Sequence, residues 1–116
     1  MKNLSLVLIL LISICSSCNK KEFVKGTAKC VEEKIKSFNL TSTCSDACVK
    51  EYMFQGSTVY AFEPGSCGRD MTTEVIDRDC KKLGYLGGFM GNTKINGEAF
   101  SKAIYIKTIW KKQKPE

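Results

Sequence analysis

The sequence predicts an α+β domain in which one N-terminal helix packs on an antiparallel sheet of about five strands, stapled by disulfides. Three observations lead to this fold class. A single stretch has the apolar spacing of a helix, and it precedes every strand-like stretch. The strand-like stretches are rich in β-branched and aromatic residues and are joined as hairpins. Five cysteines follow position 18, which is a dense set for so short a chain (Cys30, Cys44, Cys48, Cys67 and Cys80).

Residues 1–17 are expected to be a lipoprotein signal peptide. Lys2 precedes an apolar run of eleven residues, Leu4 to Ile14, which is too short to span a bilayer. Ser16 and Ser17 are small, as a signal peptidase requires, and the stretch resembles the bacterial lipobox, so Cys18 is the predicted lipidation site. The alternative is cleavage by the ordinary signal peptidase, with Cys18 left as one more thiol.

The mature chain divides into a polar tether at 18–26, a single domain at 27–112 and a basic tail at 113–116. Beyond the signal peptide it has seventeen basic and twelve acidic side chains, a net charge of about +5. Lys20 and Lys21 beside the anchor favour an anionic membrane surface as a partner. The lysines do not alternate with aromatic residues, so nucleic acid is not expected. The C-terminal lysines at 107, 111, 112 and 114 are interpreted as a solvated, frayed tail.

The helix is predicted over Thr27–Phe38. An apolar stripe runs along it at spacings of three, four and three (Ala28, Val31, Ile35 and Phe38). Thr27 can cap its first turn.

The first hairpin is predicted from strands at 49–54 and 58–62, with Gln55, Gly56 and Ser57 as a three-residue loop. Both faces of the second strand are apolar, which predicts a central place in the sheet. Strands at 72–76 and 83–86 form a second hairpin that turns through 77–82. Residues 87–97 are expected to be a long glycine and asparagine loop. A last strand at 103–110 alternates so that one face is apolar.

Disulfides are favoured over a zinc site, because the mature domain has no CxxC pair and the chain has no histidine. Five cysteines allow fifteen arrangements of two bonds and one thiol. The preferred one pairs Cys67 with Cys80 and Cys30 with Cys44, and leaves Cys48 free. A free Cys48 is either reactive, a link between two copies, or a small buried apolar residue, and the last is favoured.

The absence of histidine excludes Ser-His and Cys-His nucleophilic sites and removes the commonest general base. Asp77 and Asp79 match the start of a calcium loop, but Lys81 and Lys82 stand where further ligands and glycine belong, so a turn is favoured. No metal and no cofactor are expected.

The run from Gly84 to Lys94 is glycine-rich. Flexible backbone explains it, and so does an exposed binding loop made of Gly88, Phe89, Met90, Gly91 and Asn92, with Phe89 and Met90 as apolar contacts.

Several short segments together resemble an uncharacterised domain family found in small lipoproteins of Bacteroidota. They are EYMFQGSTVY at 51–60, PGSC at 64–67, LGYLGG at 83–88, GNT at 91–93, NG at 96–97 with Phe100, and TIW at 108–110. The resemblance extends from about Cys30 to Trp110. It implies a lipid-anchored protein of the cell envelope, at the outer membrane on its periplasmic face or at the cell surface. It implies no activity and no catalytic residues.

The sequence therefore favours a non-enzymatic binding module with an envelope protein as partner. Two alternatives stay open. One is a small hydrolase inhibitor or envelope-stress protein that uses the glycine loop. The other is an enzyme that works through Cys48 or through carboxylates such as Asp77 and Asp79.

Overall fold

The computed structural model of the chain describes residues 23–113. The predicted signal peptide, Cys18, most of the tether and the residues 114–116 lie outside this range. The described chain contains α1 (Lys29–Thr41), β1 (Cys48–Phe54), β2 (Ser57–Glu63), β3 (Thr72–Asp77), β4 (Lys82–Gly87), β5 (Lys94–Ile95), β6 (Glu98–Ala99), the 3₁₀ turn η2 (Phe100–Lys102) and β7 (Ile104–Lys111).

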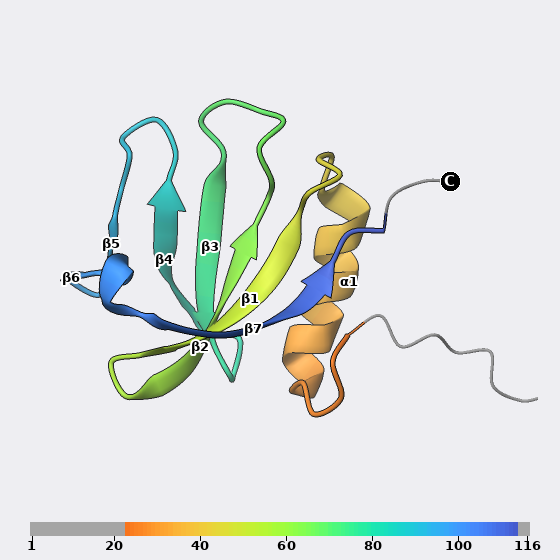
Figure 1. The fold of residues 1–116 in the computed structure, drawn as a ribbon, viewed down its shortest axis with the longest axis horizontal. Coiled ribbons are helices and arrows are strands. Elements are labelled where there is room, and N and C mark those ends of the chain that lie inside the picture. The colour runs from red at the N-terminus through yellow and green to blue at the C-terminus, as the bar shows by residue number, and fades with distance from the viewer. Residues whose placement is uncertain (1–22, 114–116) are drawn as a thin grey trace, which may run out of the picture.

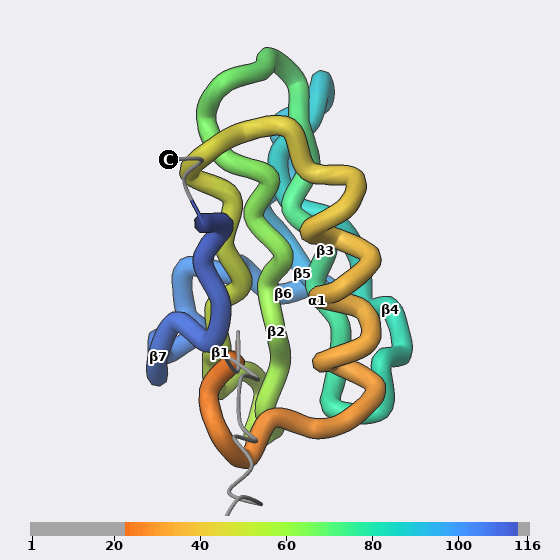
Figure 2. Tube along the Cα trace, turned by 90° about the vertical axis from the view of Figure 1, so that its right-hand side faces the viewer, coloured from red at the N-terminus to blue at the C-terminus, as the bar shows by residue number. Residues whose placement is uncertain are grey.

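Five strands form one antiparallel sheet in the order β4-β3-β2-β1-β7, and α1 precedes them all in the chain (Figure 1). The helix lies on one face of the sheet, and the short β5–β6 hairpin with η2 lies against the other (Figure 2). The predicted fold class, one helix on a five-stranded antiparallel sheet with disulfides, is confirmed.

The two faces of β2 explain why it is central. Tyr60 and Phe62 belong to the core beneath the helix, with Val31 and Ile35 of α1. Val59 and Ala61 belong to the second core, on the other face. All four β2 side chains are at most 4% exposed. A strand that is buried on both faces needs neighbours on both edges, and β2 pairs with β1 and β3.

The first hairpin has a two-residue turn instead of the predicted three-residue loop. Ser57 pairs with Phe54, and only Gln55 and Gly56 remain between the strands. Both have positive φ, 51° and 76°, which are the signs of a type I′ turn. This turn matches the twist of the flanking strands, so pairing extends one residue further than a bulged loop would permit.

Residues 87–97 are not the continuous loop that the sequence predicts. β5 pairs with β6 through a second tight turn at Asn96 and Gly97, where φ is 50° and 78°. Ile95 in this hairpin is 1% exposed and packs into the second core. The hairpin forms because it covers apolar side chains on the open face of the sheet.

β7 departs from the predicted alternation. Its register with β1 shifts twice, so that Ile106 and Ile109 have no residue directly opposite. Ile109 and Trp110 are consecutive and both buried, at 2% and 3% exposure. Ile104 and Ile106, assigned to the apolar inner face by the alternation, are instead 64% and 46% exposed.

The helix begins at Lys29 and ends at Thr41, later at both ends than predicted. Thr27 does not cap it: the Thr27 hydroxyl donates to the carbonyl of Val24 at 2.6 Å. At the other end, the Lys112 ammonium donates to the carbonyls of Asn39 and Ser42, both at 2.9 Å. Lys112 is thus half-buried and satisfies carbonyls at the end of the helix, whereas the sequence placed it in a solvated tail.

The four predicted disulfide cysteines are bonded, but the preferred pairing is wrong. The bonds join Cys30 to Cys80 and Cys44 to Cys67, with Cα–Cα distances of 6.2 and 5.4 Å. The β3–β4 turn, which carries Cys80, returns to the start of α1. The loop after β2, which carries Cys67, returns to the segment between α1 and β1. Cys48 is the free thiol, as expected.

Candidate functional site

The Gly88–Asn92 loop is a closed, well-supported turn. The Gly87 and Asn92 backbones exchange two hydrogen bonds, of 2.8 and 3.1 Å, and the Gly91 N–H donates to the carbonyl of Gly88 at 3.0 Å. The Asn92 side-chain amide donates to the carbonyls of Tyr85 and Lys94. Gly88 and Gly91 have φ of 79° and 63°, values that favour glycine. Flexible backbone alone therefore does not describe this segment.

Phe89 and Met90 occupy the tip of this turn, and they are 86% and 87% exposed. A rigid turn that holds two large apolar side chains in solvent is a preorganised contact surface. Of the predicted binding-loop residues, these two supply the apolar surface, while Gly88, Gly91 and Asn92 shape the backbone beneath it.

Two further loops lie at the same end of the sheet, and together we call the segments 42–47, 64–71 and 88–91 the loop end (Figure 1). The Gly88 N–H donates to the carbonyl of Met71 at 3.2 Å and joins two of these loops. The Cys44–Cys67 bond joins the 64–71 loop to the remaining segment, 42–47. The Asp46 carboxylate also accepts hydrogen bonds from the hydroxyl and backbone N–H of Ser66, and these lower the pKa of Asp46. The loop end is cross-linked rather than loose.

Cys48 lies at the start of β1, half-buried, on the sheet face opposite α1. Its sulfur is 3.8 Å from Oε1 of Glu63, which is paired with the Lys50 ammonium at 3.2 Å. Burial, and then the negative charge of Glu63, raise the pKa of the Cys48 thiol. A neutral thiol is a poor nucleophile, so this environment gives Cys48 no activation.

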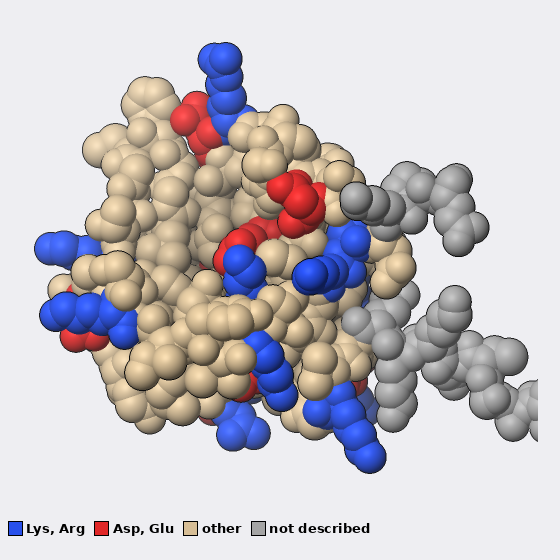
Figure 3. Space-filling view, viewed as in Figure 1, with Lys and Arg blue, Asp and Glu red and all other residues tan. Residues whose placement is uncertain are grey.

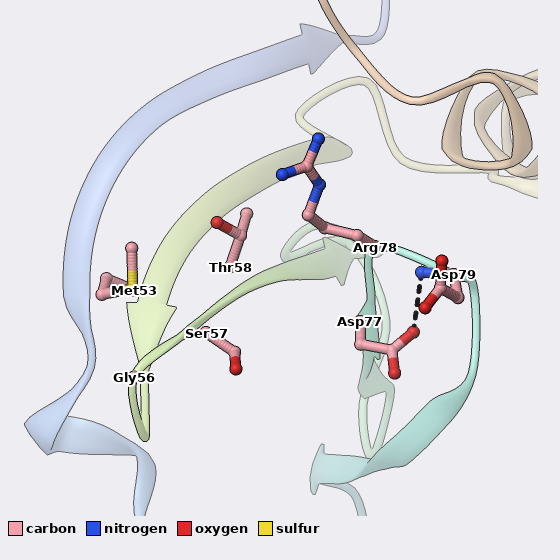
Figure 4. Close-up of a pocket in the computed structure, with 7 residues that line it drawn as sticks. All are labelled: Met53, Gly56, Ser57, Thr58, Asp77, Arg78 and Asp79. Atoms are coloured by element: carbon pink, nitrogen blue, oxygen red, sulfur yellow. Dashed lines mark hydrogen bonds between the residues drawn. The ribbon is translucent and has the colours of Figure 1, made fainter.

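The Asp77–Asp79 segment forms the β3–β4 turn, beside a shallow cleft at the opposite end of the sheet (Figure 4). The Asp77 carboxylate accepts the N–H groups of Asp79 and Lys81, at 2.8 and 2.9 Å. In Figure 4 the Arg78 side chain points away from both carboxylates. The cleft is lined by Met53, Gly56, Ser57, Thr58, Asp77, Arg78 and Asp79. Asp77 is therefore engaged in forming the turn, as the turn interpretation predicted.

Glu74 on β3 is engaged with lysines. Glu74 accepts the Lys34 ammonium at 2.8 Å and lies 3.7 Å from that of Lys82. Within residues 23–113 no three His, Cys, Asp or Glu side chains gather as a metal would require. In the same range no helix is long and apolar enough to cross a membrane.

The structure brings the predicted loop residues together but keeps Cys48 and Asp77 at opposite ends of the sheet. Sequence reasoning missed the partners that fix the loop end, above all the Met71 carbonyl and the Asp46–Ser66 contact. The only local signal for the second was Pro64 and Gly65 after β2, which marked a turn without showing what it touches.

The chain matches no curated protein and no solved structure. A family model described as "Domain of unknown function (DUF6970)" matches residues 36–112, which is more than half of the chain. The match begins within α1 and includes all of the strands, the three segments of the loop end and Lys112. The match is consistent with the resemblance to an uncharacterised domain family, and the chain belongs to the DUF6970 family.

Proposed function

We propose that this chain is an exported, lipid-anchored envelope protein of the Bacteroidota type, whose domain is a non-enzymatic interaction module. The module binds a protein partner through the loop end, with Phe89 and Met90 as its main contacts. The observation that carries the proposal is the nearly full exposure of these two side chains on a turn closed by backbone hydrogen bonds.

The energetics favour such a contact. Burying a large apolar side chain that is exposed in the free protein gains about 1.5–3 kcal/mol. Because the turn is preordered, binding costs little backbone entropy, and the main entropic cost is the lost rotamer freedom of the side chains, about 0.5–1.5 kcal/mol each.

Capture of the tagged protein from its own host after mild in-cell crosslinking tests the proposal. A partner recovered with the native chain should be lost with the double variant Phe89→Ser and Met90→Ser. Leu40→Ser is the matched control, because Leu40 is 85% exposed but lies on α1. The proposal fails if the recovered proteins are the same for the native chain and the double variant.

A hydrolase inhibitor is a second form of the same module, and the closed turn favours it, because inhibitory loops must resist rearrangement. Inhibition of envelope or secreted hydrolases that disappears in the Phe89 and Met90 variants would identify this form. The enzymatic alternative has less support, since the thiol of Cys48 is held neutral and Asp77 is engaged by backbone N–H groups.

A further inference from the structure

The end of the domain opposite the loop end carries an unusual combination of exposed side chains. We call it the basal face and define it by Val24, Lys25, Lys29, Ile104, Ile106 and Lys107. Val24, Ile104 and Ile106 are 37%, 64% and 46% exposed, and the three lysines are also exposed. Apolar side chains among lysines are typical of proteins that rest in the interface of a bilayer.

The segments that form this face come together from distant parts of the chain. The Val24 N–H donates to the carbonyl of Ile109, so the first described residues lie along the outer edge of β7. Figures 1 and 2 both place the segment before α1, the start of α1 and the beginning of β7 in the lower part of the domain. In Figure 1, β7 begins beside η2, on the side away from α1, and runs toward α1. The loops after β2 and β4 lie at the other end in both views.

Basic side chains at this end only slightly outnumber acidic ones. Arg78 and Lys81 on the β3–β4 turn are exposed nearby. The acidic residues there are Glu32 in the first turn of α1, Glu51, which is opposite Lys107 in the β1–β7 ladder, and the turn aspartates Asp77 and Asp79. The lower edge in Figure 3 shows mainly lysine and arginine among its charged side chains. The start of α1 has no side-chain cap, so its unpaired N–H groups add positive potential.

We propose that the basal face docks on an anionic lipid surface, with Ile104 and Ile106 in the interface and the lysines at the headgroups. The chain that precedes Phe23 joins the domain at this face, and only four residues separate Cys18 from Phe23. The inference deepens the proposed function and rests on the anchor proposed there: the anchor delivers this face to the membrane, and docking points the loop end away from the bilayer toward its partner.

The test uses the mature protein purified from its own host and bound to vesicles of phosphatidylcholine, with or without phosphatidylglycerol. A photoreactive benzoylphenylalanine replaces either Ile106, on the basal face, or Met90, at the loop end. Lipid adducts are expected at position 106 and not at 90, and more with phosphatidylglycerol. Lys25→Gln and Lys107→Gln should each weaken docking about fivefold, because one lysine near an anionic surface contributes about 1 kcal/mol. Lys94→Gln, at an exposed lysine on β5, is the control and should change nothing.

Equal adduct yields at positions 106 and 90, or none at 106, would overturn the docking proposal. The intact mass of the same preparation tests the lipid anchor separately, because it shows whether the protein carries acyl chains. A protein without acyl chains disproves the lipid anchor, yet position 106 still reports whether the face itself binds the anionic vesicles.

Discussion

Removal of the two disulfides, one at a time, tests both the pairing and its physical basis. In a Cys48→Ala background, the variants are Cys30→Ala with Cys80→Ala, and Cys44→Ala with Cys67→Ala. Double replacement leaves no unpaired thiol to exchange with the remaining bond. The first bond spans a sequence separation of 50 residues and the second one of 23.

The magnitudes follow from the loop that each bond closes in the unfolded chain. Chain entropy predicts a loss of about 4.1 kcal/mol for a closed loop of roughly 50 residues and about 3.4 kcal/mol for one of roughly 23. Both losses are a large share of the about 5–15 kcal/mol that stabilises a typical domain. The Cys30–Cys80 variant should therefore be the less stable of the two.

Urea unfolding followed by Trp110 fluorescence measures the free energies, and peptide mapping without reduction identifies the bonds. The reasoning is refuted if mapping recovers a Cys67–Cys80 peptide. It is also refuted if removal of the bond that closes the shorter loop lowers the free energy of unfolding clearly more than removal of the bond that closes the longer loop. Chain entropy would then not determine the loss.

Three further changes have definite expected outcomes. Lys112→Met leaves carbonyls at the end of α1 without their charged donor and should cost about 1.5–3 kcal/mol in urea unfolding. Gly65→Ala should lower the free energy of unfolding by more than about 2 kcal/mol, or prevent folding. The φ of Gly65 is +100°, and the new Cβ would lie 2.6 Å from the Cβ of Cys44. The rate of alkylation of Cys48 should rise with pH, with a midpoint at a higher pH than for an ordinary thiol, because burial and Glu63 raise the pKa of Cys48. Glu63→Gln removes a negative charge and should lower this pH midpoint. An alkylation midpoint unchanged by Glu63→Gln would contradict the assigned contact.

Local patterns predicted the elements well, because each element is specified by residues within it. The apolar stripe through Val31 and Ile35 placed the helix, and the boundaries of the five predicted strands differ from the observed ones by one residue at most, although β5 and β6 were not predicted. Tyr60, Phe62 and Val59 also gave β2 its central position, since apolar side chains on both faces require cover on both faces.

Features that depend on contacts between distant segments were missed. The disulfide pairing depends on where the β3–β4 turn lies relative to α1, and nothing near Cys80 encodes that position. The bulges of β7 arise from its fit to β1, so alternation along β7 assigned Ile104 and Ile106 to the core. The role of Lys112 is of the same kind, because its acceptors belong to the far end of the helix.

The candidate loop was predicted as a set of residues but not as a structure. Glycines at 88 and 91 indicated either flexibility or a binding loop. The distinction depends on the Gly87–Asn92 bridge and on the Met71 carbonyl, which only the folded sheet brings into reach.

The pairing of β1 with β7 has a consequence for the order in which the fold can form. β1 is the first strand to leave a ribosome or a translocation channel, and its outer neighbour is the last. Until β7 arrives, the β1 edge has no partner and α1 lacks both Trp110 beneath it and Lys112 at its end. On the export proposed above, the chain would therefore stay unfolded, and able to pass through a translocation channel, until nearly all of it has crossed the membrane.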